Sequence, residues 1–340
     1  MKMQENIALA PYTTFNIGGP ARFFCRVTTE QELIEAVDFA RKNKLRTLIL
    51  GGGSNILISD AGFPGLVIKN EIVGISVKQN TDGTSTLSLG AGESWDGIVA
   101  YSVERGLYGI ENLSAIPGTV GATPVQNIGA YGREIASVLV SLRAYDIKKM
   151  KMVELDNKDC EFSYRDSIFK KCKGRYVITS VSLSLRSDGV VDITYRDLKD
   201  YFANKQQSAP SLADVRQAVI EIRRKKLPDW KVWGTAGSFF KNPIISARAY
   251  AKLKKEYADM PGYPESDGRV KVPLGWILDH VCHIKGHMVG NVGSYENQAL
   301  VIVTKPGATA SEVVARANEI MDMVAKMTGI KVEAEVEWVN

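Results

Sequence analysis

The stretch TLILGGGSNILIS, residues 47–59, joins two apolar runs through three glycines, a serine and an asparagine. The first run is typical of a buried strand, and the second of another extended segment. Upstream, Thr29 and Glu32 have the spacing of a capping box, and Leu33 and Val37 share one face of the helix that it opens. This order of elements predicts an α/β unit.

The glycine run, residues 51–53, has two interpretations. A Rossmann fingerprint needs a helix to open at the glycines, with an acid about twenty residues on, where Glu71 stands. An apolar, strand-like run follows here instead, so that fingerprint is rejected. Glycine N–H groups can still form an anion-binding nest without a helix. A phosphate site and a plain tight turn both remain open.

The composition is ordinary for a globular protein: 340 residues, 45% hydrophobic and 24% charged, enough for two or three domains. A net charge of +5 fits a small anionic ligand and is too weak to predict nucleic-acid binding. The opening segment does not resemble a signal peptide, and no apolar run is long enough to span a membrane. Four scattered cysteines indicate reduced thiols, so we expect a cytoplasmic protein.

Residues 111–135, ENLSAIPGTVGATPVQNIGAYGREI, form a glycine-rich segment that is poor in charge. Its glycines allow close approach of the backbone, and Gln126 and Asn127 offer amide donors and acceptors. A flavin ring presents alternating donors and acceptors along one edge, so it suits such a surface. The alternative is a pair of purely structural loops.

Ser238 lies in GTAGSFFKNP, residues 234–243, and could be a nucleophile, a phosphate ligand or a residue with a less usual role. A serine hydrolase is disfavoured, because the motif is not a G-x-S-x-G elbow. All three histidines, His280, His283 and His287, cluster in one segment, with Cys282 between the first two. Gly286 interrupts any helix there, so a polar loop is favoured over a metal site.

A helix is expected to begin at Ser211, which caps it, and to end before Leu227-Pro228. Its last residues, 221–226, are the basic run EIRRKK. Most such basic runs are solvated faces, although cations also pair strongly with a diphosphate. A last helix is expected from Thr309 to Gly329, followed by a terminal strand over residues 330–339.

Taken together and in this order, the motifs resemble the UDP-N-acetylenolpyruvoylglucosamine reductase family. They cover nearly the whole chain and read TTFNIGGPA, LILGGGSNILISD, GIENLSAIPGTVGATPVQNIGAYG, CEFSYRDSIFK, KKLPDWKVWGTAGSFFKNP, GWILDH, QALVIV and VEAEVEWV. The uninterrupted ITYRDL with Tyr195 resembles the form of the family with a tyrosine loop over the substrate.

The resemblance implies an α+β and α/β architecture with a vanillyl-alcohol-oxidase-type FAD-binding fold. Two FAD-binding subdomains would comprise residues 1–70, joined by the terminal strand at 330–340, and residues 71–226. A C-terminal α+β substrate domain would comprise residues 227–329.

The resemblance also implies non-covalent FAD, and residues 107–136 contain no histidine or cysteine that could tether it. NADPH would be the co-substrate, and because no separate nicotinamide motif is present, we expect both substrates to use one pocket in turn. The implied cofactor residues are Gly51, Gly52, Gly53, Ser54, Asn55, Ser114, Ile116, Pro117, Gly118, Thr119, Gly121, Ala122, Gln126, Asn127, Gly129, Ala130 and Tyr131.

The implied reaction is the reduction of UDP-N-acetylglucosamine enolpyruvate to UDP-N-acetylmuramate, a step of peptidoglycan synthesis. Hydride addition at C3 leaves negative charge at C2 and the carboxylate, so the enzyme needs a partner for that charge and a proton for C2. The family pattern places Arg165 and Glu335 at the enolate and makes Ser238 the proton donor. Glu335 would have to act as an acid, which burial beside a ligand carboxylate favours.

The same matching implies substrate-binding residues: Tyr164, Tyr195, Lys226, Asn242, Tyr263, Lys285 and Gln298. One position departs from the family pattern, because Glu337 stands where an arginine is usual. Lys285 could replace that cation, or substrate binding could differ in detail.

Two other functions are alternatives. One is an FAD-dependent sugar or alcohol oxidase of the same fold, and the other is a non-enzymatic nucleotide-sugar or nucleic-acid binder using the basic run. The second leaves the glycine-rich segment without a role. We therefore expect a monomeric enzyme that binds neither nucleic acid nor membranes.

Overall fold

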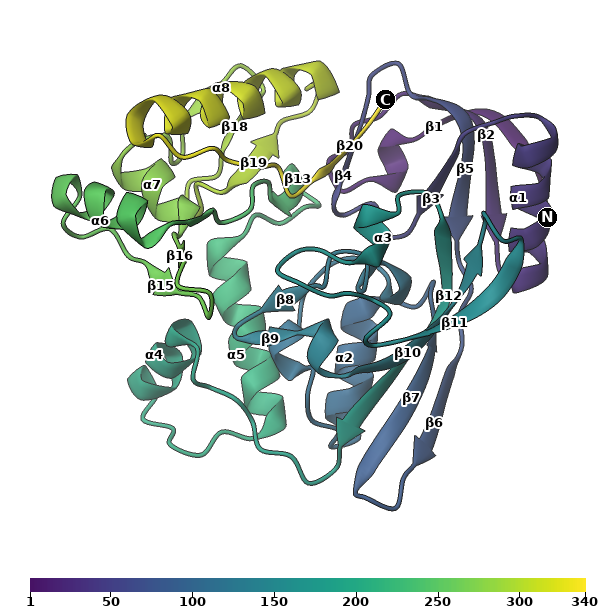
Figure 1. Cartoon of the computed structure of the whole chain (residues 1–340), viewed down its shortest axis with the longest axis horizontal. Coiled ribbons are helices and arrows are strands. Elements are labelled where there is room, and N and C mark those ends of the chain that lie inside the picture. The colour runs from purple at the N-terminus through teal and green to yellow at the C-terminus, as the bar shows by residue number, and fades with distance from the viewer. The chain divides into compact units, whose positions relative to one another are not determined.

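The computed structural model describes residues 1–340, which divide into two compact units (Figure 1). The first comprises residues 1–7, 21–53 and 64–223, and the second residues 8–20, 54–63 and 224–340. The chain passes from one unit to the other within the stretch 47–59. The three-part division implied by the resemblance remains a prediction.

A four-stranded sheet in the order β1-β2-β5-β3 begins the first unit. Strand β3 pairs with β5 in parallel, and helix α1 (Glu30–Lys42) buries Leu33 and Val37 against this part of the unit, as predicted. The α/β unit predicted here is therefore present. The strands are β1 (Gln4–Ala8), β2 (Pro20–Val27), β5 (Phe63–Asn70) and β3 (Thr47–Leu50).

A five-stranded antiparallel sheet, in the order β11-β10-β12-β7-β6, forms the rest of the first unit's framework. Trp95 and Ile98 of helix α2 (Trp95–Glu104) lie in the core beside it. The strands are β6 (Ile75–Gln79), β7 (Thr84–Gly90), β10 (Leu139–Asp146), β11 (Lys151–Asp156) and β12 (Tyr176–Arg186). The remaining elements are the hairpin β8 (Gly129–Ala130) and β9 (Arg133–Glu134), and the helices α3 (Ile168–Lys171), α4 (Arg196–Asn204) and α5 (Leu212–Lys226).

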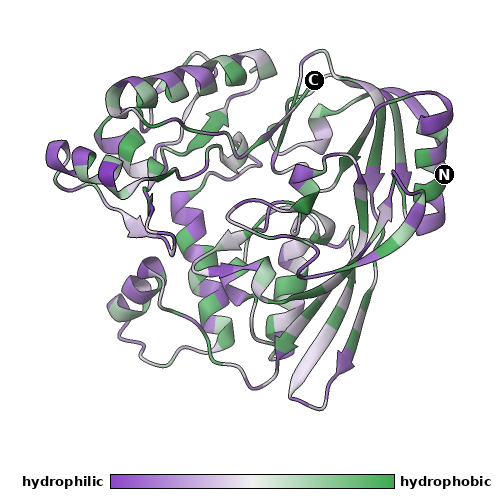
Figure 2. Ribbon diagram, viewed as in Figure 1, coloured by the Kyte–Doolittle hydropathy of each residue, from purple (hydrophilic) through white to green (hydrophobic).

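The second unit is built on a sheet in the order β13-β19-β18-β17, with helix α8 (Ala310–Thr328) packed on β18 and β19. In Figure 2, α8 alternates between apolar and polar residues, because its buried positions recur every three or four residues. The sheet strands are β13 (Gly234–Ser238), β17 (Met288–Val289), β18 (Val292–Ser294) and β19 (Val301–Thr304). The other elements are β14 (Ile244–Ile245), β15 (Tyr263–Pro264), β16 (Val270–Lys271), α6 (Ala247–Glu256) and α7 (Leu274–His280).

Strand β4 (Ile56–Ile58), the second apolar run of the quoted stretch, does not join the sheet of β3. It pairs in parallel with β20 (Glu337–Val339) at the end of the chain, within the second unit. The predicted terminal strand is thus confirmed only over its last residues. The residues before it are engaged elsewhere, since Glu335 and Lys241 donate backbone hydrogen bonds to Phe239 and Glu333.

The predicted helix ends are largely confirmed. Thr309 and Glu312 form a complete capping box, and Gly329 ends α8 in the left-handed conformation with φ of 72°. At α1, Thr29 caps the helix, but the carboxylate of Glu32 accepts from the backbone N–H and hydroxyl of Thr28. None of the helices is long and apolar enough to cross a bilayer.

Asp146 is a buried acid at the end of β10, where its carboxylate accepts from the Lys148 and Lys149 N–H groups and from the guanidinium of Arg175. Burial by itself raises the pKa of Asp146, but Arg175 and these N–H groups more than offset it, so the pKa lies below its usual range.

We expect Asp146→Ala to lower the free energy of unfolding by about 2–4 kcal/mol, because it leaves Arg175 and two turn N–H groups without their acceptor. A depressed carboxyl pKa stabilises the fold above the unfolded-state pKa and loses that effect as pH falls. Urea unfolding should therefore show that the difference in unfolding free energy between wild type and Asp146→Ala becomes smaller below about pH 4. Asp188→Ala, which breaks an exposed Arg–Asp pair, is the matched control; an equal effect there would contradict the prediction.

Candidate functional site

The glycine run meets the glycine-rich segment backbone against backbone. A Cβ added to Gly52 would lie 2.5 Å from the Cα of Gly118, and one added to Gly51 would lie 2.6 Å from the Oγ1 of Thr119. Gly121 is equally confined, since its added Cβ would lie 2.6 Å from the Cβ of Ala91. Only glycine fits at these positions, so the two loops present main chain rather than side chains. This arrangement suits a phosphate or flavin ligand.

Lys69, which the sequence analysis missed, lies at this loop and donates a hydrogen bond to the Gly51 carbonyl. Burial lowers the pKa of Lys69. It sits on β5 opposite Leu50, the last residue before the glycine run. In the sequence, the feature that could have pointed to Lys69 is a single charged residue near the end of the mostly apolar FPGLVIKN. In the structure, Lys69 supplies positive charge beside the loop.

Two predicted cofactor residues have side chains that are already used within the protein. The amide of Asn127 donates to Glu134 and to the Ser163 carbonyl, while its oxygen accepts from the Ala136 N–H. The hydroxyl of Ser114 donates to the Glu111 carbonyl at 2.6 Å. Neither side chain therefore has an N–H or O–H left to donate to a cofactor. The other predicted cofactor residues lie on the same two loops: Gly53, Ser54, Asn55, Ile116, Pro117, Ala122, Gln126, Gly129, Ala130 and Tyr131.

Arg165 is held against the glycine-rich segment. It occupies the tip of a turn closed by backbone bonds between Ser163 and Asp166, and its φ of 55° is left-handed. Its guanidinium donates to the Gly129 carbonyl at 2.6 Å, and a Cβ on Gly129 would lie 2.9 Å from Nη1. The ring of Tyr164 lies 5.5 Å from this guanidinium. A fixed positive charge thus lies beside the expected flavin surface.

Tyr195, the expected substrate-covering tyrosine, stands immediately before α4 and is 46% exposed. Its ring packs edge-on against Tyr131, with the centroids 5.5 Å apart. Burial raises the pKa of Tyr131 to about 12. The structure therefore brings a predicted substrate residue and a predicted cofactor residue together.

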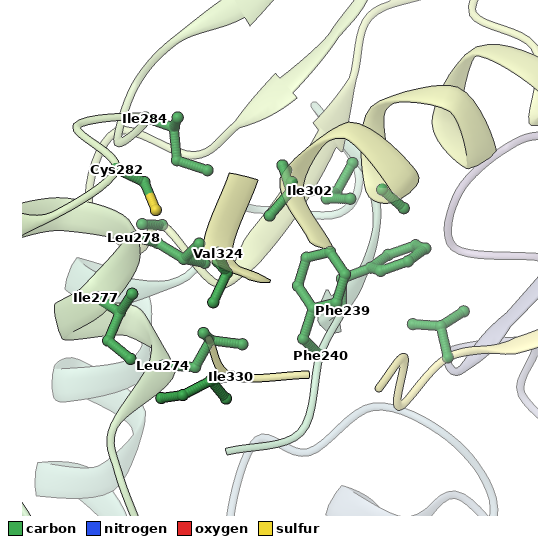
Figure 3. Close-up of a cluster of buried hydrophobic side chains, with 14 of the residues drawn as sticks. Phe239, Phe240, Leu274, Ile277, Leu278, Cys282, Ile284, Ile302, Val324 and Ile330 are labelled. Atoms are coloured by element: carbon green, nitrogen blue, oxygen red, sulfur yellow. The ribbon is translucent and has the colours of Figure 1, made fainter. Parts of the chain in front are cut away.

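In the second unit, the structure brings Ser238 and Glu335 together. Ser238 ends β13 and is exposed, whereas the next two residues, Phe239 and Phe240, are buried in the core shown in Figure 3. The N–H of Glu335 donates to the Phe239 carbonyl at 2.8 Å. Gly237, with φ of 73°, supplies the bend before the serine. Ser238 is thus anchored by buried neighbours while its hydroxyl reaches solvent.

Asn55 connects the end of the glycine run to this pair. Its side-chain amide donates to the Glu335 carbonyl at 3.2 Å, and its own carbonyl accepts from the Glu337 N–H at 3.0 Å. The side chain of Asn55 therefore positions the segment that carries Glu335. This role was not visible in the sequence, because 280 residues separate the two.

Asn242 and Gln298 meet at the start of α7. The Oδ1 of Asn242 accepts from the Leu274 N–H at 2.9 Å, and a Cβ on Gly275 would lie 2.8 Å from the Oε1 of Gln298. The side-chain oxygen of Asn242 is thus committed to the helix, which leaves its NH₂ group as the donor for a ligand.

The other predicted substrate residues are more dispersed. Lys285 pairs with Asp279 at 2.8 Å, near the end of α7 that is opposite to the one bound by Asn242. Tyr263 is 54% exposed on β15, and Lys226 is the half-buried last residue of α5.

The histidine cluster does not form a metal site. His280 stacks on Trp276 with the ring centroids 4.7 Å apart, and Nδ1 of His287 faces Arg316 at 3.4 Å. No group of three histidine, cysteine or acidic side chains is arranged to hold a metal ion.

Comparison with known proteins identifies the family. Residues 21–156 match an FAD binding domain, and residues 228–339 match the C-terminal domain of UDP-N-acetylenolpyruvoylglucosamine reductase. The reductase of Ralstonia nicotianae is 44% identical over 337 residues, which is 98% of each chain. The chain belongs to the UDP-N-acetylenolpyruvoylglucosamine reductase family. A second family member, from Neisseria gonorrhoeae, is 43% identical over 97% of this chain and 95% of its own.

The fold of this family has also been seen in a crystal. The structure of UDP-N-acetylenolpyruvylglucosamine reductase from Thermus caldophilus aligns over 100% of both chains with a TM-score of 0.69 and 22% identity. The predicted family, the fold class, the flavoenzyme class and FAD as the cofactor are thereby confirmed. The individual site residues remain predictions, supported by the local geometry.

Replacing Gly52 by alanine should weaken FAD binding by about tenfold or more, because its Cβ would force the Gly118 backbone away. Quenching of flavin fluorescence on titration of the apoprotein measures this affinity. Gly97→Ala is the control, since its nearest neighbour would lie at an ordinary 3.4 Å. Equal FAD affinity in both variants would show that the close approach does not matter for the cofactor.

Proposed function

We propose that this chain reduces UDP-N-acetylglucosamine enolpyruvate to UDP-N-acetylmuramate with NADPH and FAD, in peptidoglycan precursor synthesis. Family membership supports the reaction as a whole. The observation that supports it most directly is that the Glu335 N–H donates to the carbonyl of Phe239, the residue after Ser238. The proposed proton donor for C2 and the proposed hydrogen-bonding acid for the enolate therefore lie on adjacent segments, and this reaction needs both groups.

The residues present fit FAD. The glycines let the two loops pack closely against each other, so the loops expose main-chain groups, and Lys69 adds positive charge; both features suit a diphosphate. When bound, FAD supplies the hydride carrier between NADPH and C3 of the enolpyruvyl group. Every remaining requirement falls on the protein: to bind the substrate, stabilise the developing charge and deliver one proton.

Ser238 would donate that proton to C2. An alkanol is a weak acid in water, but a strongly basic, carbanion-like C2 accepts its proton readily. No base is needed, which agrees with the absence of a histidine beside Ser238 and with its exposure, since water can restore the proton afterwards. The buried Phe239 and Phe240 hold the hydroxyl in place.

Arg165 and Glu335 would stabilise the enolate. The guanidinium of Arg165 is already fixed by two backbone carbonyls, so little reorganisation is needed when negative charge develops. Glu335 would contribute as a hydrogen-bonding acid. Its half-buried position and backbone anchoring are consistent with this role.

Substrate binding would use the donors at the start of α7, Asn242 and Gln298, and the cation Lys226 toward the diphosphate. Lys285, Tyr263, Tyr164 and Tyr195 are proposed as further contacts. Lys285 pairs with Asp279, and it remains a proposed substitute for the arginine that the family usually has at the position of Glu337. We further propose that the enzyme is monomeric, and that it is cytoplasmic because all four cysteines are free thiols.

The proposed function is tested by flavin colour under anaerobic conditions. Purified protein loaded with FAD should be yellow, lose its colour with NADPH and regain it when the enolpyruvyl substrate is added. Recovery with oxygen but not with that substrate would favour the oxidase alternative. Protein that binds no FAD would refute both.

Ser238→Ala should separate the two half-reactions. We expect NADPH to reduce the flavin at nearly the wild-type rate, while turnover of the enolpyruvyl substrate falls by about 10²- to 10⁴-fold. Stopped-flow absorbance of the flavin measures each step. Ser182→Ala, at an exposed serine contact, serves as the control. Equal loss in both half-reactions would indicate that Ser238 holds the cofactor instead.

A further inference from the structure

Ala115 is a strained residue near the start of the glycine-rich segment. Its φ of 57° is left-handed, which a residue with a Cβ adopts only when its surroundings hold it there. The Ala115 N–H donates to Oδ1 of Asp96 at 2.6 Å, and its carbonyl accepts from Nε of Arg223 at 3.3 Å. Side chains from two different helices therefore hold both polar groups of this residue.

Asp96 is itself fixed by a bidentate partner. Nη1 of Arg216 donates to its Oδ1 at 2.7 Å and Nη2 to its Oδ2 at 3.0 Å. Such a fork restrains both distance and orientation. The side chain of Arg216 is 16% exposed, whereas that of Asp96 is 38% exposed. The family pattern gave no role to either residue.

Helix α5 supports both ends of the segment. Arg216 and Arg223 are seven residues apart, two helical turns, so they share one face of α5. Arg223 also hydrogen-bonds Tyr131, which is left-handed too, with φ of 47°. On one face of α5, Arg216 therefore supports Ala115 through Asp96. On the same face, Arg223 binds both Ala115 and Tyr131 directly.

We propose that Asp96 and Arg216 are positioning residues for FAD, which hold residues 114–117 in the left-handed turn that the cofactor meets. The inference rests on the proposed function and names two residues outside its binding and catalytic set. A turn that is ordered before the ligand arrives does not have to be ordered on binding, so affinity rises without a direct contact.

The structural alternative is that the pair merely ties α2 to α5. The chain offers a matched control for that role. Arg143 also forms a two-point fork with Glu30 in the first unit, side-on and through a more exposed arginine, with Nε to Oε1 at 2.7 Å and Nη2 to Oε2 at 3.0 Å. Neither of these residues contacts the glycine run or the glycine-rich segment through any described hydrogen bond. Breaking the control pair should therefore affect stability only.

The experiment compares the FAD dissociation constant of the apoprotein with its urea midpoint in Arg216→Met, Arg216→Lys, Asp96→Asn and Arg143→Met. We expect Arg216→Met to raise the dissociation constant about tenfold, and Arg216→Lys to recover part of the loss. Asp96→Asn should raise it less, because its amide oxygen still accepts from Ala115. Arg143→Met should leave it within about twofold of wild type.

The outcomes are separable. Unchanged FAD affinity in the Arg216 and Asp96 variants, with only a lower urea midpoint, would overturn the positioning role. An equal loss of affinity in Arg143→Met would also overturn it, since the effect would then follow general stability. A wild-type chain that binds no FAD would contradict the proposed function instead.

Discussion

The backbone at Gly52 lies so close to the backbone at Gly118 that no side chain fits between them. Because of this contact, the two loops expose main-chain groups at the surface where the cofactor is expected to bind. Loops without side chains cannot hold themselves in place, so their polar main-chain groups need partners from elsewhere. Lys69 supplies one at Gly51, the Ala91 carbonyl another at Gly121, and Asp96 and Arg223 hold Ala115 from both sides.

The second unit instead holds one exposed side chain in place, that of Ser238, the proposed proton donor. Ser238 is exposed between the left-handed Gly237 and two buried phenylalanines. The N–H of Glu335, near the end of the chain, donates to the carbonyl of Phe239, the residue after Ser238. The core therefore determines where the hydroxyl lies (Figure 3). A proton donor needs this placement more than it needs a partner base.

Two polar residues that were expected to bind the cofactor use their side chains in hydrogen bonds within the protein. Asn127 uses its whole side-chain amide on Glu134, Ser163 and Ala136, and Ser114 uses its hydroxyl on Glu111. Both were assigned to the cofactor from the sequence alone. A polar residue inside a glycine-rich segment has two competing uses, ligand contact and loop support, and its type does not distinguish them. Only the hydrogen bonds of the folded chain do.

The sequence by itself determined the α/β start, the helix caps at Ser211 and Thr309, the glycine-rich surface and, through its motifs, the family. These features depend on local periodicity, on caps and on the absence of Cβ atoms, all of which are readable within a few residues. Only the tertiary structure decided that β4 leaves the sheet of β3 to pair with β20, that Asn55 holds Glu335, and that Arg216 supports Ala115 through Asp96. The partners in these contacts are 19 to 281 residues apart, and their pairing depends on how strands and helices pack rather than on any local pattern.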